Sequence, residues 1–244
     1  MTEARPTDGI PLLSFAPEGV AVVFGAGGGI GAALVQTLRG SQHFSQVLAF
    51  GRRTTPAIDL LDESTLERAA ELASDSGTLR LVIDATGFLH DERQMPEKSW
   101  RQLDANSLAR CFALNATGPA LIMKHVLPHL PREGKSVFAT LSARVGSIGD
   151  NRLGGWYGYR ASKAALNQIV RTAAVELARR SPSALCIALH PGTVATALSA
   201  PFEARGLQVH RPEEAARHLI GVIDTLGVDA NGGFFDWRGL PVPW

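Results

Sequence analysis

The stretch Val20-Ala-Val-Val-Phe24-Gly25-Ala-Gly-Gly-Gly29-Ile30-Gly31 decides the fold, because a short apolar run leads directly into a glycine-rich loop. A helical pattern follows at once. Glycine lets the backbone turn sharply and approach a ligand, and the N-terminus of a following helix offers free N–H groups. Strand, loop and helix in this order therefore predict a cradle for the pyrophosphate of a dinucleotide. The spacing is not the usual G-x-G-x-x-G, which leaves a plain glycine turn as the alternative.

Apolar runs of strand length alternate with helical patterns along the rest of the chain. The expected strands are Val20–Phe24, Val47–Phe50, Leu79–Asp84, Ser136–Leu141, Leu185–His190 and Gly233–Asp236. The expected helices are Ile30–Gly40, Asp62–Ser74, Ser107–Leu130, Tyr159–Arg180 and Pro212–Leu226. Continuous apolar runs are typical of parallel strands buried on both faces. The pattern predicts an α/β fold, a doubly wound parallel sheet (Rossmann fold) with helices on both faces, in which residues 1–17 are an extended lead-in and 18–244 one domain.

Composition excludes several classes of protein. The 244 residues are 45% hydrophobic and 19% charged, with a net charge of +1, which fits a globular domain and gives no basic surface for nucleic acid or an anionic membrane. No apolar run reaches membrane-spanning length, and no early h-region is present, so we expect a cytoplasmic protein. The two cysteines are far apart in apolar stretches, and the seven histidines do not group at ligand spacings. We therefore expect no disulfide and no metal site.

Two arginines follow the second expected strand, as Gly51-Arg52-Arg53. An acidic residue at this place would bind a ribose 2′-hydroxyl, whereas arginine suits a 2′-phosphate. The pair therefore favours NADP(H) over NAD(H), with a solvated arginine pair as the alternative.

Tyr159 and Lys163 are four residues apart, so on a helix they share one face. A phenol with an ordinary pKa of about 10 exchanges protons poorly at neutral pH. A neighbouring ammonium favours the phenolate and lowers that pKa, which would make Tyr159 a usable acid/base.

Two further polar residues stand at places where a site could form. Ser142 follows an expected strand and would lie at the carboxyl edge of the sheet, where α/β folds bind ligands. Asn115 lies inside the expected helix Ser107–Leu130, four residues before Pro119. Because proline has no N–H, the helix should kink there and leave the carbonyl of Asn115 free.

Glycine loop, Asn115, Ser142 and the Tyr159–Lys163 pair, in this order, resemble the short-chain dehydrogenase/reductase family over residues 20 to 240. The stretch His190-Pro-Gly-Thr-Val-Ala-Thr196 is similar to the family's Pro-Gly-x-Val-x-Thr segment. The ending Gly233-Phe-Phe-Asp236-Trp-Arg-Gly-Leu-Pro-Val-Pro-Trp244 resembles its C-factor-like branch. The resemblance implies reversible hydride transfer between nicotinamide and a small carbonyl or alcohol, and it favours reduction of the carbonyl.

The resemblance also implies roles by position. Tyr159 would be the general acid/base, Lys163 would lower its pKa and bind the nicotinamide ribose, and Ser142 would hold the carbonyl oxygen. Asn115 would keep a water in a proton relay to Lys163. The coenzyme set would be Gly25, Gly29, Ile30 and Gly31 at the pyrophosphate, Arg52 and Arg53 at the 2′-phosphate, Asp59, Leu60, Ala85 and Gly87 at the adenosine side, and Pro191, Gly192, Val194 and Thr196 at the nicotinamide end.

The chain departs from the family pattern in three places. Phe24 stands where the family often has threonine, and Gly28 stands where many NADP(H) members carry a basic residue. The usual Asn-Asn-Ala-Gly is replaced by Asp84-Ala85-Thr86-Gly87, which puts side-chain hydrogen bonding at the adenosine side in doubt.

Other functions are less well supported by the sequence. A dinucleotide-binding regulator or signalling protein without turnover has no need for Lys163 beside Tyr159. A hydrolase would need G-x-S-x-G, which is absent, and Gly134-Lys135-Ser136 lacks the first glycine of a phosphate loop. We expect a lid at Ala197–His210 (Phe202, Leu207 and Val209 apolar, Glu203 and Arg205 charged), with Leu153 and Trp156 near an apolar substrate. The expected long helices carry apolar residues on more than one face, for example Leu166, Ile169, Val170 and Ala173. One face must cover the sheet, so the surplus predicts a homodimer or homotetramer interface.

Overall fold

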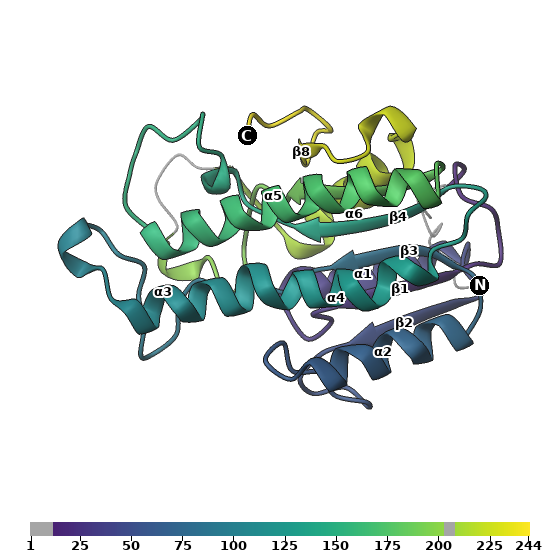
Figure 1. Cartoon of the computed structure of the whole chain (residues 1–244), viewed down its shortest axis with the longest axis horizontal. Coiled ribbons are helices and arrows are strands. Elements are labelled where there is room, and N and C mark those ends of the chain that lie inside the picture. Colours follow the sequence, from purple (N-terminus) through teal and green to yellow (C-terminus); the bar gives the residue numbers. More distant parts are fainter. Residues whose placement is uncertain (1–11, 203–207) are drawn as a thin grey trace, which may run out of the picture.

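The computed structural model describes residues 12–202 and 208–244. Within these residues a sheet of six parallel strands has the order β2-β1-β3-β4-β5-β8 (Figure 1). The strands are β1 (Val20–Phe24), β2 (Gln46–Phe50), β3 (Leu79–Asp84), β4 (Ser136–Leu141), β5 (Ala184–His190) and β8 (Phe234–Asp236). The strands match the expected ones to within one residue at each end, and the doubly wound parallel sheet is confirmed.

Helices cover both faces of the sheet (Figure 1). They are α1 (Gly29–Ser41), α2 (Glu63–Asp75), α3 (Ala105–Phe112), α4 (Gly118–Val126), α5 (Tyr157–Arg180) and α6 (Pro212–Thr225). One hydrophobic core lies between the sheet and α2, α4 and α5, and the other lies between the sheet and α1 and α6. Residues of β1 alternate between the two cores, with Val22 in the first and Val23 in the second. Both faces of the strand are thus buried, which explains its continuous apolar sequence.

The long helix expected over Ser107–Leu130 is interrupted at the predicted place. A π-helical turn, Ala113–Thr117, separates α3 from α4, and a 3₁₀ turn, Leu127–His129, follows α4. The N–H of Gly118 bonds the carbonyl of Ala113, five residues earlier. Pro119 has no N–H to offer Asn115, so the helix widens by one residue around the polar side chain.

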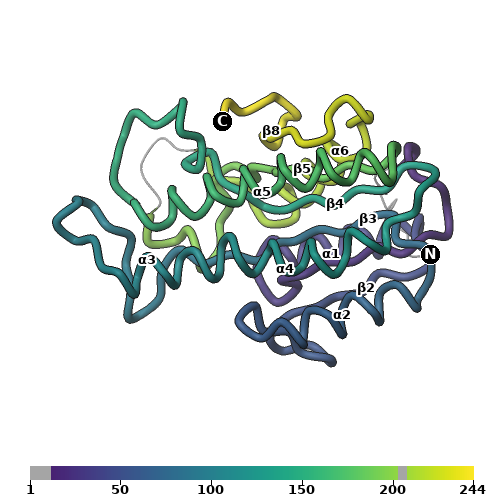
Figure 2. Tube along the Cα trace, in the orientation of Figure 1, coloured from purple at the N-terminus to yellow at the C-terminus, as the bar shows by residue number. Residues whose placement is uncertain are grey.

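Several short elements of the structure were not predicted from the sequence. β6 (Thr193–Val194) and β7 (Val209–His210) form a two-stranded parallel ribbon. The remaining 3₁₀ turns are Trp100–Gln102, Arg144–Gly146, Ala200–Phe202 and Val228–Ala230. The C-terminus returns to the loop before α5, where Gly149 N–H donates to the carbonyl of Trp244 over 2.8 Å (Figure 2).

Lys135 binds the C-terminal end of α6 and does not belong to a phosphate loop. Its Nζ donates to the carbonyls of Ile223, Asp224 and Leu226 over 2.8–2.9 Å, which are acceptors left over at a helix C-terminus. The same ammonium donates to Ser14 Oγ, and nearby Phe15 is buried in the core with α1 and α6. Part of the expected extended lead-in therefore belongs to the packed body. Among the helices of residues 12–202 and 208–244, none is long and apolar enough to cross a membrane.

Candidate active site

A cleft of about 350 Å³ lies at the carboxyl ends of β1, β2 and β3. The chain leaves β1 toward β2 on one side and reaches β3 on the other, so this is the point where the strand order reverses and where open α/β sheets bind ligands. Seven predicted coenzyme residues line it, namely Gly25, Arg52, Arg53, Asp59, Leu60, Ala85 and Gly87. A larger cavity of about 590 Å³, on the outer side of α4 and α5, holds none of the predicted site residues.

Two glycines of the loop are required by close backbone contacts. Gly25 has φ +79°, and a Cβ there would lie 2.7 Å from the carbonyl of Ala85. A Cβ on Gly31 would lie 2.2 Å from the carbonyl oxygen of Gly25. Gly27, in contrast, lines the cleft, and a Cβ added there would meet no atom within 4 Å. Glycine thus permits a tight turn at Gly25 and Gly31 and leaves open space at Gly27.

The N-terminus of α1 is uncapped at this cleft. Gly28 is the N-cap residue and has no side chain to accept from the first N–H groups, and the first turn carries no acidic residue. The free N–H groups and the dipole favour an anionic group there. The side chain of Ile30 packs against the core with α1 and α6, so only its backbone could face an anionic group at the cleft.

Positive charge stands on the β2 side of the cleft. Arg52 and Arg53 are exposed at its lining, and neither forms an ion pair or hydrogen bond with another residue of the described chain. Arg110, also at the lining, is paired with Asp91, whose pKa falls to about 2 because Arg110 hydrogen-bonds it. Arg52 and Arg53, which follow β2, are therefore arginines of the cleft lining that remain available to bind a phosphate.

Asn115 fastens the segment after β3 to the helices. Its Nδ2 donates to the carbonyl of Phe88 over 2.8 Å, and the N–H of Phe88 donates to Asn115 Oδ1 over 2.7 Å. Nδ2 also lies 3.1 Å from Ser162 Oγ on α5. The side chain of Asn115 is fully buried, so the π turn places an amide between the segment after β3 and α5.

Tyr159 and Lys163 lie in the first turns of α5, both buried. Lys163 Nζ donates to the carbonyl of Leu141 over 2.8 Å, and a Cβ on Gly87 would lie 3.7 Å from this nitrogen. Gly87 lines the cleft, so the ammonium sits directly beneath its inner wall. Within the described chain, the Tyr159 hydroxyl makes no hydrogen bond.

The electrostatics of this pair differ from the expectation. Burial raises the pKa of Tyr159, with a smaller contribution from Cys111, so the net shift in this structure is opposite to the expected lowering. Burial also disfavours the charged form of Lys163 and lowers its pKa to about 8, although the buried carboxylate of Asp84 acts to raise it. The sequence could not show this, because desolvation depends on how deeply each group is packed.

Asp84 is the buried carboxyl that replaces the family's usual asparagine. It accepts from Thr86 N and Oγ1 and from Thr140 Oγ1 at 2.6–3.0 Å. Burial raises its pKa, although these bonds and the charge of Lys163 act to lower it.

Ser142 points at α5. Its Oγ donates to Asn167 Oδ1 over 2.6 Å, and Asn167 Nδ2 is buried without a partner among the described residues. Turned by 180°, the same amide would donate to Ser142 Oγ and leave the hydroxyl proton free. Asn167 is thus a neighbour of the site that the sequence analysis missed, although its position four residues after Lys163 places it on the same helix face.

The residues predicted for the nicotinamide end follow β5. A Cβ on Gly29 would lie 2.7 Å from Thr196 Cγ2, so Thr196 contacts the glycine loop. Val194 is buried in β6, and Gly192 has φ +78° and lies against Trp237 and His210. Pro191, half-buried, precedes this turn.

An aromatic group stands near Tyr159. Trp156 lies edge-on to Tyr159, with ring centroids 6.2 Å apart, and Phe202 contacts both Trp156 and His90. His90 lines the cleft. Leu153 is 90% exposed, and its place near the substrate stays a prediction. Of the predicted lid, Glu203, Arg205 and Leu207 lie outside the described residues.

The expectation that the histidines do not group as possible metal ligands is wrong. His210 and His218 come together with Glu214, and one potential ligand atom from each lies within 4.8 Å of the others. The signal in the sequence is the spacing of four residues between His210, Glu214 and His218, of which only the last two share a helix.

The sequence of the chain is similar to those of known proteins. A family model described as enoyl-(acyl carrier protein) reductase matches residues 19–222. The chain is 37% identical to C-signal of Myxococcus xanthus over 142 residues, 58% of this chain and 81% of that protein. It is 32% identical to 1-hydroxy-2-glutathionyl-2-methyl-3-butene dehydrogenase of Rhodococcus sp. over 200 residues, 82% of this chain and 84% of that protein.

Solved structures share the fold. The NADPH-bound carbonyl reductase from chicken fatty liver superposes with a TM-score of 0.82 at 22% identity, covering 95% of this chain and 96% of that one. Carbonyl reductase Sniffer of D. melanogaster gives 0.79 at 21% identity, covering 93% and 100%.

Proposed function

Since the chain belongs to the short-chain dehydrogenase/reductase family and is an NAD(P)-dependent oxidoreductase acting on CH–OH or C=O groups, we propose that it reduces a small carbonyl compound with NADPH. The observation that carries this proposal is the buried pair Tyr159 and Lys163 beneath Gly87, at the inner wall of the cleft.

The residues present fit a dinucleotide. The uncapped N-terminus of α1 and the close-packed turn at Gly25 and Gly31 suit a pyrophosphate. Arg52, supported by Arg53, would bind a 2′-phosphate through charge-assisted hydrogen bonds. Asp59, Leu60, Ala85 and Gly87 would contact the adenosine side, and Pro191, Gly192, Val194 and Thr196 the nicotinamide end.

In the reaction, bound NADPH supplies a hydride to the carbonyl carbon. Tyr159 gives its hydroxyl proton to the carbonyl oxygen, which completes the alcohol and leaves the phenolate. Burial raises the pKa of Tyr159, so the phenol is protonated at neutral pH and gives up its proton only when a neighbouring positive charge stabilises the phenolate.

Three neighbours assist Tyr159 in this proposal. Lys163 stabilises the phenolate and binds the nicotinamide ribose with the donors that Leu141 leaves unused. Ser142 holds the substrate oxygen, and an N–H of Asn167 donated to Ser142 Oγ would keep the serine proton available for it. The carbonyl of Asn115, which Pro119 cannot bond, would hold a water that returns a proton toward Lys163.

Tyr159→Phe tests the chemical role. The variant keeps the ring and loses the proton, so turnover of a carbonyl panel, followed by NADPH absorbance, should vanish while NADPH binding stays unchanged. Tyr157→Phe, two residues earlier, is the matched control and should keep its activity. Full activity of the Tyr159 variant would refute the assignment.

Arg52→Gln tests the coenzyme preference. Loss of one charge-assisted bond to a phosphate is worth about 1.5–3 kcal/mol, so the ratio of kcat/KM for NADPH over NADH should fall by about 10- to 100-fold. Arg68→Gln, an exposed arginine on α2 away from the cleft, is the control and should leave the ratio unchanged.

A second candidate function draws on the similarity to C-signal: a signalling or regulatory protein that binds the dinucleotide without turnover. The wild-type chain discriminates between the two. Turnover on the carbonyl and alcohol panel supports the enzyme, whereas NADPH binding without any turnover supports the regulator.

We also propose that the chain forms a homodimer or homotetramer. Leu166 and Val170 are buried in the core, whereas Ile169 and Ala173 line the cavity between α4 and α5. This outer face is the place where a second copy would pack. A light-scattering mass of one chain would contradict the proposal, and the cytoplasmic location stays a prediction from the sequence.

A further inference from the structure

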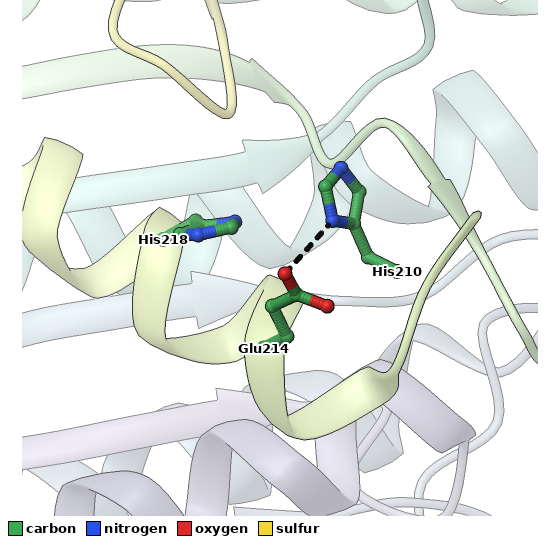
Figure 3. Close-up of side chains that lie close together, drawn as sticks. All are labelled: His210, Glu214 and His218. Atoms are coloured by element: carbon green, nitrogen blue, oxygen red, sulfur yellow. Dashed lines mark ion pairs between the residues drawn. The ribbon is translucent and has the colours of Figure 1, made fainter. Parts of the chain in front are cut away.

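Three side chains with metal-binding atoms meet beside the β6–β7 ribbon. His210 ends β7, and Glu214 and His218 lie on consecutive turns of α6. Residues four apart share a helix face, so Glu214 and His218 point the same way. The turn at Arg211 and Pro212 folds β7 back onto this face, and Figure 3 shows the three side chains gathered on one side of α6.

The distances suit a small cation. His210 Nδ1 and Glu214 Oε1 are 3.4 Å apart, which is longer than the 2.7–2.9 Å of a good charged hydrogen bond. It is close to the edge of a tetrahedron whose centre lies about 2.0–2.1 Å from each ligand, roughly 3.3–3.4 Å. The three ligand atoms lie within 4.8 Å of one another, so side-chain rotation of His218 is the movement still needed.

One unpaired nitrogen atom of the cluster points to a missing ligand. His218 Nδ1 is buried and has no hydrogen-bond partner within the described residues. His210 is itself 2% exposed. A buried ring nitrogen without a partner is costly, and a metal bond is one way in which neutral histidine satisfies it.

The surroundings hold the rings in place. Trp237 lies over His218 at 4.9 Å between centroids and edge-on to His210 at 4.4 Å. A Cβ on Gly192 would lie 3.1 Å from His210 Cδ2 and 3.0 Å from Trp237, so the group is packed directly against the turn after β5. Glu214 is 40% exposed, which leaves a path for an ion from solvent.

We propose that His210, Glu214 and His218 bind one divalent transition-metal ion, with zinc as the best fit, and that the ion fastens β7 to α6. Two imidazoles and one carboxylate suit zinc and its neighbours in the first transition row, whereas magnesium and calcium prefer oxygen ligands. Water completes the coordination on the exposed side of Glu214. The ion holds the ribbon that carries Val194, close to the proposed nicotinamide end, and takes no part in hydride transfer.

The experiment uses the full chain without an affinity tag, stripped with a chelator and free of NADPH, because tags and phosphates bind zinc themselves. Zinc chloride should bind at one ion per chain by calorimetry and elemental analysis. At a hundredfold excess over Kd, the melting temperature should rise by roughly 5–10 °C. Magnesium chloride should give no rise.

Variants identify the site. Glu214→Gln and His218→Gln should each weaken zinc binding at least about tenfold, and both residues are exposed enough for the fold to survive, as circular dichroism will show. Glu213→Gln removes the same charge one residue away and should bind zinc like the wild type. The proposal is overturned if the wild type binds no stoichiometric zinc, or if the Glu213 variant loses binding as much as the Glu214 variant.

Discussion

Gly31→Ala probes the glycine loop most directly. Gly31 lies in the first turn of α1, where alanine would ordinarily favour the helix by up to about 1 kcal/mol. Here the new Cβ would lie 2.2 Å from the carbonyl oxygen of Gly25, which must retreat by about 0.8 Å to reach even 3.0 Å. Both flanking contacts, to Gly25 C and Ala26 Cα, are backbone as well, so no side chain can rotate away.

The clash should outweigh the gain in helix propensity. Overpacking costs about 1–3 kcal/mol and more where backbone must move, so we expect a net loss of roughly 1–3 kcal/mol. For a domain of this size the melting temperature should fall by roughly 2–10 °C. The displaced turn carries the N–H groups proposed for the pyrophosphate, so the Kd for NADPH should rise at least about tenfold.

Gly27→Ala is the matched control in the same loop. Its Cβ meets no atom within 4 Å, so the free energy of unfolding should change by less than about 0.5 kcal/mol. The methyl group projects at the cleft, so NADPH binding should still weaken. Thermal melting and fluorescence titration of both variants separate the two effects. An unchanged melting temperature in the Gly31 variant, or an equal loss in both, would refute the packing argument.

Three further predictions concern the site. Burial lowers the pKa of Lys163 to about 8, so its ammonium is present below that pH and lost above it. The affinity for NADPH, titrated between about pH 7 and pH 9.5, should therefore fall in a step near pH 8, and Lys163→Met should abolish this step. Asp84→Asn removes the carboxylate that raises the pKa of Lys163, so the same titration should show the step at lower pH; a step at higher pH would contradict the proposed coupling. Ser142→Ala should lower kcat/KM for the carbonyl by about 10²–10³-fold while the Kd for NADPH stays constant, and parallel losses in both would indicate a structural role.

The fold follows from sequence because local and tertiary signals agree. β1 is a continuous apolar run and β4 a mostly apolar one, and the structure buries every one of their residues, so the hydrophobic pattern alone located them. Pro119 located the break in the long helix, because its missing N–H acts within one helical turn. The sequence does not predict the π turn itself, because the hydrogen bonds of Asn115 with Phe88 and Ser162 join segments that meet only in the folded chain.

The electrostatics of the site were less predictable for the same physical reason. Spacing shows that Tyr159 and Lys163 share a helix face, but it does not show that both are buried or that Lys163 Nζ bonds Leu141. The pKa of each group is set mainly by that desolvation. A motif therefore identifies which groups meet, whereas their protonation depends on packing contributed by distant strands.

The His210–Glu214–His218 cluster is the case in which spacing was visible and still insufficient. Four-residue spacing implies a shared face only while the chain is helical, and α6 begins at Pro212, after His210. His210 reaches the cluster because β7 pairs with β6, a ribbon too short to leave an apolar pattern. Periodicity therefore does not predict a set of metal ligands that comes from a strand and a helix. The proposed hydride transfer does not predict one either, because it needs no metal. The pairing of β7 with β6 brings His210 to α6, beside the residues proposed for the nicotinamide end, so zinc binding and the position of the β6–β7 ribbon should be measured together.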